Sequence, residues 1–308
     1  MIVGKRYIKI VGSCNGLLCL VHVRYDPDIT GAILWNPCTG FTSEPTPEIT
    51  GVFAYGGFGY DHTSNSYKLF MAVMVSKYDE RTRIFTFSPD CSFWRTIENF
   101  DFSLLGHPRT RRCFFPIEYD NEVGVFVSGS NTLNWNCQRR GFGILKVDDV
   151  VSLDLGKESY GILPLPERDP EDNCSMNVEL SLLRDCLTVC YEHKGTHWAV
   201  WIMKEYRVIE SWTRLALIPC QVFIPKYGLC CLKPLYIFED DVLLAFSPYY
   251  NIVLCDLNNP DATLVPVIDE GTEDAISSSF HVYRESLISP SPLLPSSRYD
   301  DLTNASLL

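Results

Sequence analysis

The hydrophobic and polar positions of this chain form short apolar runs separated by polar turns. One run, Val200-Trp201-Ile202-Met203, is continuous and rich in strand-favouring residues, so it predicts a strand buried on both faces. Residues 204–207 are a polar connector, and Glu210-Ser211-Trp212-Thr213-Arg214-Leu215 then alternates as a half-buried strand would. The stretch from Ala199 to Leu215 therefore predicts two neighbouring β-strands.

The same layout recurs along the chain. The positions taken as equivalent are separated by 51, 67, 49 and 52 residues, and they are Trp35, Thr86, Leu153, Ile202 and Leu254. A sheet-sized unit repeated every ~40–50 residues is typical of propellers and related arrays. The pattern therefore predicts a repeat protein.

A second recurring piece is a turn that precedes another apolar strand in each unit. These turns are Asn15-Gly16, Ser64-Asn65-Ser66, Ser130-Asn131, Arg184-Asp185 and Glu239-Asp240-Asp241. Asn-Gly is the strongest short hairpin signal, because both residues tolerate a positive φ. Each unit is therefore interpreted as three or four antiparallel strands, which is one propeller blade.

Together these patterns predict an all-β fold, a β-propeller-like ring of about six antiparallel blades, in a domain spanning residues 1–290. A strand at Val282–Ile288 is expected to complete a blade with the N-terminal segment. The tail, residues 291–308, is rich in Pro, Ser and Asp and is predicted to be disordered. No amphipathic helix of normal length is predicted.

Charge and composition narrow the range of partners and locations that the protein can have. The 308 residues carry a formal net charge of −12, which argues against a nucleic acid or an anionic membrane surface as partner. No apolar run approaches the roughly 18 residues needed to span a bilayer. Residues 1–6 lack the apolar core of a secretory signal. A cytoplasmic and/or nuclear location is expected.

The 13 cysteines are an odd number with irregular placement. Five lie within apolar strand runs, where a free cysteine behaves as a small hydrophobic residue: Cys19, Cys186, Cys190, Cys230 and Cys255. The pattern Cys186-x3-Cys190-x2-His193-x3-His197 invites comparison with zinc sites, but Cys₂His₂ sites separate their ligand pairs by a longer segment. We therefore predict strand cysteines beside a hairpin turn and no metal.

No catalytic residues are predicted. Gly56-Gly57-Phe58-Gly59 is followed by neither Lys-Ser/Thr nor a helix, so it predicts a tight turn between strands instead of a phosphate-binding loop. The six histidines suggest no Ser/His/Asp set. Four aspartates lie at turns or strand ends, where their side chains bond nearby backbone: Asp61, Asp154, Asp185 and Asp256. A propeller glycoside hydrolase with two acids near strand ends stays open as an alternative.

Several motifs, taken in order, resemble the plant F-box-associated (kelch-like) interaction domain of F-box proteins. They cover roughly residues 8–290 and comprise Gly12-Ser13-Cys14-Asn15-Gly16-Leu17-Leu18-Cys19-Leu20, Leu34-Trp35-Asn36-Pro37-Cys38-Thr39-Gly40, Gly57-Phe58-Gly59-Tyr60-Asp61 through Tyr67-Lys68, Trp198–Tyr206 with Glu210-Ser211-Trp212-Thr213, and Val282–Pro290. Several ordered motifs together are far more specific than any single one.

The resemblance implies a propeller related to kelch propellers, without enzymatic activity or a cofactor, that captures target proteins for an SCF-type E3 ubiquitin ligase. In such proteins an N-terminal F-box docks on the adaptor subunit of the ligase. No Leu/Pro-rich helical segment precedes Gly12. The F-box itself is therefore expected to be missing, and the SCF adaptor/cullin complex is expected as a partner only if an F-box is supplied.

Two questions about the partner stay open at the level of the sequence. The target protein and its contact residues are unknown, although loops at one rim are predicted to contact it: residues 41–55, 98–121, 167–176 and 268–279. A truncated scaffold without ubiquitin function, or a competitor of intact relatives, is the alternative to a working receptor.

Overall fold

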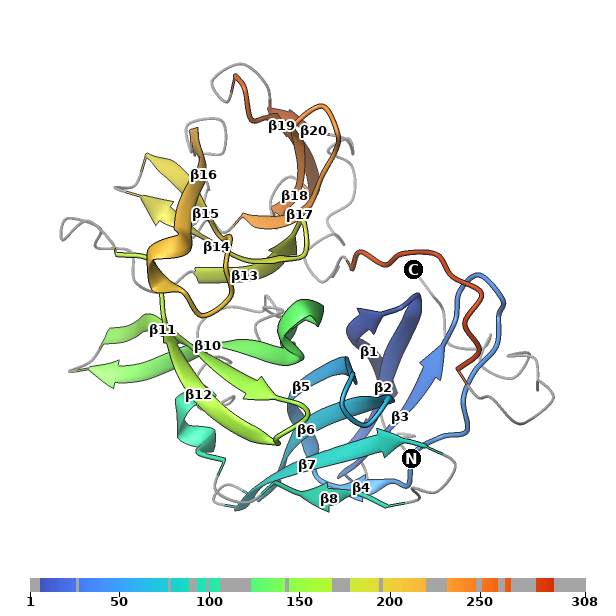
Figure 1. Cartoon of the computed structure of the whole chain (residues 1–308). Helices are drawn as coiled ribbons and strands as arrows, with labels where there is room; N and C mark the ends of the chain where they lie inside the picture. The colour runs from blue at the N-terminus through green and yellow to red at the C-terminus, as the bar shows by residue number, and fades with distance from the viewer. Residues whose placement is uncertain are drawn as a thin grey trace. The chain divides into compact units, whose positions relative to one another are not determined.

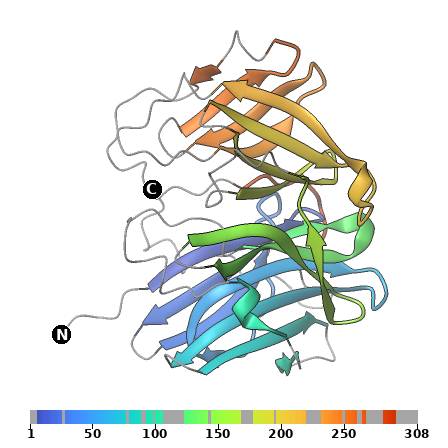
Figure 2. The same cartoon turned by 90° about the vertical axis from the view of Figure 1, so that its left-hand side faces the viewer.

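The computed structural model describes residues 6–25, 28–76, 79–88, 93–97, 100–105, 123–141, 144–167, 178–193, 196–219, 232–247, 251–259, 264–266 and 281–290. Within these residues the regular structure consists of β-strands and 3-10 turns of three or four residues. The strands form five four-stranded antiparallel sheets, each built from four strands consecutive in sequence (Figure 1; Figure 2). The predicted all-β, blade-like fold is confirmed.

The first two sheets contain β1 (Arg6–Cys14), β2 (Leu17–Tyr25), β3 (Asp28–Trp35) and β4 (Ile49–Thr50), then β5 (Val52–Asp61), β6 (Ser66–Ser76), β7 (Asp79–Phe87) and β8 (Arg95–Thr96). The third contains β9 (Val125–Val127), β10 (Thr132–Gly141), β11 (Ile144–Asp154) and β12 (Ser159–Pro164). The last two contain β13 (Val178–Leu183), β14 (Cys186–His193), β15 (His197–Met203) and β16 (Trp212–Pro219), then β17 (Lys233–Ile237), β18 (Val242–Ser247), β19 (Asn251–Asp256) and β20 (Leu264–Pro266). The 3-10 turns are η1 (Phe102–Leu105), η3 (Ser128–Ser130) and η4 (Ile209–Ser211).

The predicted repeat matches the strand order. Each of the five equivalent positions lies on the third strand of its sheet: Trp35, Thr86, Leu153, Ile202 and Leu254. Their partners on the second strands are Leu18, Lys68, Leu133, Thr188 and Leu244. The spacing of apolar runs in the sequence therefore identified corresponding positions in the blades.

The predicted turns also lie between the first and second strands, and they have the expected backbone. Left-handed residues with φ between 51° and 60° occur at Asn15, Asn65, Asn131, Arg184, Asp185 and Asp241. Asn and Asp tolerate this conformation better than most residues with a side chain. Local sequence therefore sets each hairpin.

The described residues group into two compact units, and in the second unit buried side chains fill the spaces between consecutive sheets. This unit holds the described parts of residues 101–154 and 159–280. One cluster, including Leu163, Val189 and Trp212, joins the sheet β9–β12 to the sheet β13–β16. Another, including Trp198 and Val253, joins that sheet to β17–β20. Face-to-face burial of this kind is the main stabilising term of stacked sheets.

The first unit holds the described residues up to Phe100, the turn Leu155–Glu158 and the segment from His281. Here the prediction for Gly56-Gly57-Phe58-Gly59 is wrong, because these residues lie inside β5 and pair with β6. A Cβ on Gly56 would lie 2.7 Å from the Phe53 ring and 3.4 Å from Cγ1 of Val11 on β1. Glycine therefore permits close packing of side chains against this strand, which is a known reason for glycine within strands.

The prediction of a strand at Val282–Ile288 is also wrong, because residues 281–289 carry no strand hydrogen bonding. Side chains hold this segment instead, through Ser13, which bonds the Val282 carbonyl, and Asn36, which bonds the Ser286 and Ile288 carbonyls. The described residues accordingly contain five blades, where about six were expected. The predicted tail, residues 291–308, and Cys230 lie outside the described residues.

Candidate functional site

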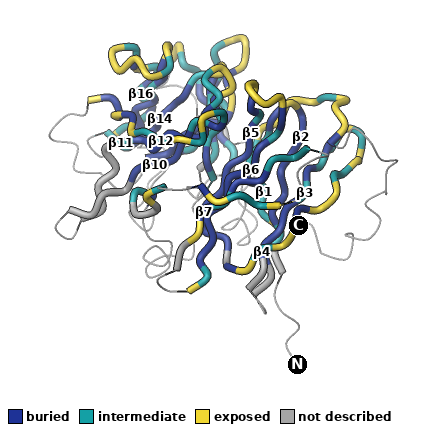
Figure 3. Tube along the Cα trace, turned by 60° about the horizontal axis from the view of Figure 1, so that its bottom comes forward, coloured by how far each residue is buried: buried dark blue, intermediate teal, exposed yellow. Residues whose placement is uncertain are grey.

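One end of each sheet carries exposed connectors, and we call it the turn end. Because consecutive strands are antiparallel, the turn between the first and second strands lies at the same end as the connector between the third and fourth. Figure 3 shows buried strands and exposed connectors. Large exposed hydrophobic side chains in these turns and connectors are Phe41, Phe93, Val208, Ile209 and Phe238.

The connector between β15 and β16, residues 204–211, has an extensive network of hydrogen bonds of its own. The Ser211 hydroxyl lies 2.7 Å from the Val208 carbonyl and 2.9 Å from the Glu205 carbonyl, and accepts from the Glu205 N–H at 3.1 Å. Backbone bonds join Val208 N–H to Glu205 O at 3.0 Å and Ser211 N–H to Val208 O at 3.0 Å. A loop that satisfies its own backbone groups in this way is held in one conformation.

Tyr206 anchors this connector to the preceding sheet in the same unit. Its hydroxyl donates to Oδ1 of Asn134 at 2.7 Å and accepts from the Thr132 hydroxyl at 2.8 Å, and it lies 2.6 Å from Oγ of Ser152. The three partner residues on β10 and β11 are buried. Arg207 adopts φ 67°, and its guanidinium lies 5.8 Å from the centre of the Tyr206 ring.

The connector presents an apolar pair at its outer edge. The side chains of Val208 and Ile209 are 39% and 46% exposed, and the exposed charged residues Arg207 and Glu210 flank them. A preformed apolar surface with a polar rim is the usual composition of a protein-binding surface. The pair is not predicted by the polar connector at residues 204–207, although two adjacent aliphatic residues between charged ones are a signal for it in the sequence.

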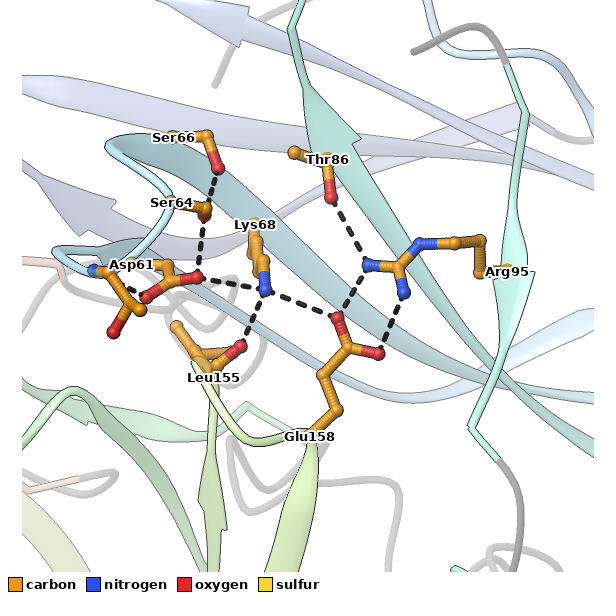
Figure 4. A network of polar contacts seen from close by, with 9 residues as sticks. Asp61, Ser64, Ser66, Lys68, Thr86, Arg95, Leu155 and Glu158 are labelled. Atoms are coloured by element: carbon orange, nitrogen blue, oxygen red, sulfur yellow. Dashed lines mark hydrogen bonds and ion pairs between the residues drawn. The ribbon is translucent and has the colours of Figure 1, made fainter.

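A second cluster is a network of charged and polar side chains in the first unit (Figure 4). Lys68 on β6 is only 5% exposed, and its Nζ lies 2.9 Å from Oδ2 of Asp61, 3.1 Å from Oε1 of Glu158 and 2.6 Å from the Leu155 carbonyl. Arg95 on β8 makes a two-point contact with Glu158 at 2.5 and 2.9 Å. All residues of this network belong to the first unit.

The protonation of Glu158 indicates what this network can do. Burial alone would raise the pKa of its carboxyl, but hydrogen bonds and charges from Arg95 and Lys68 outweigh burial, so the pKa lies below its ordinary value. A glycosidase acid needs the opposite, a pKa raised towards neutrality. Asp61 is 1% exposed and accepts from the Thr63 N–H and the Ser64 hydroxyl. This geometry favours a structural role for the network.

The cysteine and histidine residues of the zinc-like pattern lie on one hairpin. Cys186 and Cys190 are on β14, and His193 pairs with His197 across to β15. Burial raises the pKa of the Cys186 thiol, with a smaller effect of the Asp185 charge. Across the described part of the chain, no group of three or more His, Cys, Asp or Glu side chains is placed to hold a metal ion.

The other predicted features are only partly described. Asp61 and Asp256 bond the backbone two residues on, as expected. The predicted 41–55 loop is wrong in part, because residues 49–50 lie in β4 and residues 52–55 lie in β5. In the remaining connector, the buried Thr46 accepts from the Ala32 N–H at 3.0 Å. The loops at 98–121, 167–176 and 268–279 lie largely outside the described residues. In the described ranges, no helix is long and apolar enough to cross a membrane.

Comparison with solved structures gives only weak likenesses. Prolyl oligopeptidase B from Galerina marginata superposes with a TM-score of 0.43 at 7% identity, over 87% of this chain and 38% of that one. The polysaccharide lyase Uly1 gives 0.40 at 10% identity, over 80% of this chain and 54% of its own. Likenesses at this level carry no argument about function.

Comparison with sequences is more specific. An F-box/kelch-repeat protein of Arabidopsis thaliana is 28% identical over 71% of this chain and 55% of its own length. F-box protein CPR1 of the same plant is 26% identical over 82% of this chain and 59% of its own length. The chain thus spans somewhat more than half the length of these relatives. The model of the F-box associated beta propeller domain matches residues 4–289, and the chain belongs to this family.

Proposed function

We propose that this chain is a protein-recognition domain that binds substrates for an SCF-type E3 ubiquitin ligase. The relatives are named as F-box proteins, and an F-box is the module expected to dock on the ligase adaptor. In this proposal the domain performs no chemistry of its own. It works in the cytoplasm or nucleus, and neither nucleic acid nor a membrane is its partner.

The observation that carries the proposal is the preformed 204–211 connector. A surface that is already ordered loses little conformational entropy when a partner binds. Val208 and Ile209 supply apolar contact area, while the charges of Arg207 and Glu210 at its edge would select the partner. We therefore place the target-binding surface at the turn end around this connector.

Capture and ubiquitination assays test the proposal together. The full chain is expressed in plant cells behind an F-box, either unchanged or as the variant V208D/I209D. We expect the unchanged chain to enrich a target that accumulates ubiquitin in a cullin-dependent way. The variant should capture at least tenfold less target than the unchanged chain. It should still retain the adaptor, since the adaptor would bind the F-box.

A matched control separates this surface from general apolar exposure. Ile162 on β12 is 40% exposed and lies in the same unit as the connector. The Ile162→Asp variant should keep the target. Equal loss in both variants would contradict the assigned surface. A captured target that never gains ubiquitin would instead favour the scaffold or competitor alternative.

A further inference from the structure

The segment of residues 281–290, which we call the strap, is attached to the first sheet through hydrogen bonds to its backbone. Four of its apolar side chains are exposed, Val282, Tyr283, Leu287 and Ile288, and Leu287 is 86% exposed. Pro290 is buried, so hydrophobic burial contributes at one end of the strap. Hydrogen bonds to backbone carbonyls hold the part from Val282 to Ile288, where the four exposed side chains lie.

Asn36 provides the main attachment. This residue has no exposed surface, and its Nδ2 donates to the Ser286 carbonyl at 3.0 Å and to the Ile288 carbonyl at 2.8 Å. Its Oδ1 is occupied locally, because it accepts from the Cys38 N–H at 2.8 Å. Both amide hydrogens are thus aimed at the backbone of the strap, and without the strap they would need another acceptor.

The Asn15-Gly16 turn contacts one side chain of the strap, that of Ser286. The Ser286 hydroxyl donates to the Asn15 carbonyl at 2.6 Å, a distance too short for a carbon atom in its place. A Cβ on Gly16 would lie 2.6 Å from Cβ of Ser286 and 2.8 Å from the Arg284 carbonyl. The turn therefore accepts an extended chain only where a small residue faces it.

A third contact extends the site along the strap. The Ser13 hydroxyl donates to the Val282 carbonyl at 2.8 Å. Three backbone carbonyls of the strap are therefore recognised by side chains of the first sheet, at Val282, Ser286 and Ile288. Recognition through main-chain groups with one size-selective position is typical of sites that bind extended peptides.

We propose that Ser13, Asn15, Gly16 and Asn36 form a binding site for an extended polypeptide with a serine or smaller residue opposite Gly16. In this structure the chain's own strap occupies the site, which we call the strap site. A segment of another protein with the same features would compete with the strap. The identity of that competitor as a recruited target rests on the proposed function, whereas the site itself does not.

The test uses the full chain and a fluorescent peptide with the sequence of residues 281–290. The variant S286K places a carbon against the Asn15 carbonyl and should release the strap, leaving the site intact. Because the tethered strap competes at a high effective concentration, the peptide should bind S286K at least tenfold more tightly than the unchanged chain. A peptide carrying the Ser286→Lys change should not bind, and one carrying Leu287→Ala should bind as the original does.

Variants of the site complete the experiment. In the S286K background, Asn36→Asp keeps the acceptor for Cys38 but removes both donors, so peptide binding should be lost. Phe41 is exposed and ends the turn that begins at Asn36, whose N–H bonds the Phe41 carbonyl. The control Phe41→Ala should therefore leave binding unchanged. Cleavage after Arg284 by an arginine-specific protease should be faster in S286K and in N36D, where the strap is released, but not in F41A.

Either of two results overturns the proposal. Cleavage after Arg284 that stays unchanged in S286K and N36D means that these contacts do not hold the strap. Released strap without peptide binding means that the site does not accept a peptide. Neither measurement involves an F-box, an adaptor or ubiquitin, so failure here is distinguishable from failure of the proposed ligase role.

Discussion

The hydroxyl of Tyr206 donates to Oδ1 of Asn134 across 2.7 Å and so joins the connector of one sheet to a strand of the preceding sheet. Two further hydroxyls, from Thr132 and Ser152, meet the same phenol oxygen. One atom therefore satisfies three buried polar side chains and also fixes the connector that carries Val208 and Ile209. Stability and the candidate binding surface are coupled at this residue.

Replacing Tyr206 with Phe should lower the free energy of unfolding by about 1–3 kcal/mol, because Asn134 and two hydroxyls lose a buried partner. Urea unfolding measures the change. Tyr236→Phe is the control, since Tyr236 is 48% exposed, and it should change the free energy by less than ~0.5 kcal/mol. Equal effects of both substitutions would contradict the role of the Tyr206 hydroxyl.

The Gly16→Ala substitution should destabilise the protein more than Gly40→Ala. Both glycines have a left-handed backbone, with φ of 82° and 74°, so an alanine costs about 1–2 kcal/mol at either position. Only at Gly16 would the new Cβ meet the strap, at Ser286 and the Arg284 carbonyl, whereas nothing lies within 4 Å at Gly40. Thermal unfolding of the two variants compares them directly, and a larger loss at Gly40 would contradict the contact.

The Lys68→Met substitution should cost about 3–5 kcal/mol, because it leaves the carboxylates of Asp61 and Glu158 without their shared cation. The double variant K68M/D61N also removes the buried charge of Asp61, whereas Glu158 keeps its contact with Arg95, so the double variant should recover part of this loss. Chemical unfolding of the single and double variants provides the measurement. A double variant less stable than K68M would show that the Asp61 carboxylate contributes independently of the lysine.

The sequence predicted those parts of the fold that depend on local signals. The Asn15-Gly16 turn and the run at Val200–Met203 lie where expected, because hairpin chemistry and apolar runs act within a few residues. Gly56 was misinterpreted because its reason lies in side-chain packing, chiefly against the Phe53 ring at 2.7 Å, with Val11 of β1 at 3.4 Å. The glycine composition of the segment could not distinguish a turn from a close approach.

The strap and the Tyr206 network were not predictable for a similar reason. Asn36 bonds a carbonyl 250 residues away in sequence, and Tyr206 bonds a side chain 72 residues away. Hydrogen bonds between distant segments leave no periodicity in a single sequence. The motif resemblance identified both segments as characteristic of the family, but the contacts of their side chains required the structure.

Thiol reactivity should differ sharply among the described cysteines. Burial raises the pKa of Cys14 and of Cys255 to about 12, and it also raises the pKa of the fully buried Cys19. Cys38 is exposed. Since the thiolate is the reactive form, iodoacetamide should modify Cys38 in the folded protein well before the other three. Peptide mass spectrometry over a time course resolves each site, and early labelling of Cys19 would contradict the packing of β2.

The stabilising contribution of Glu158 should disappear at acid pH. Burial alone would raise its pKa, but Arg95 and Lys68 together lower it below the value in the unfolded chain, so the unfolded state binds more protons as the pH falls. The contribution is therefore complete above the unfolded pKa, about 4.3, and is lost as the pH falls through the lower folded pKa.

The difference in unfolding free energy between the unchanged protein and Glu158→Gln should be constant from about pH 6 to about pH 8 and should shrink below about pH 4. Urea unfolding at several pH values tests this, with the exposed Glu44→Gln as control. A difference that grows on acidification would mean that the two cations do not stabilise the charged form of Glu158.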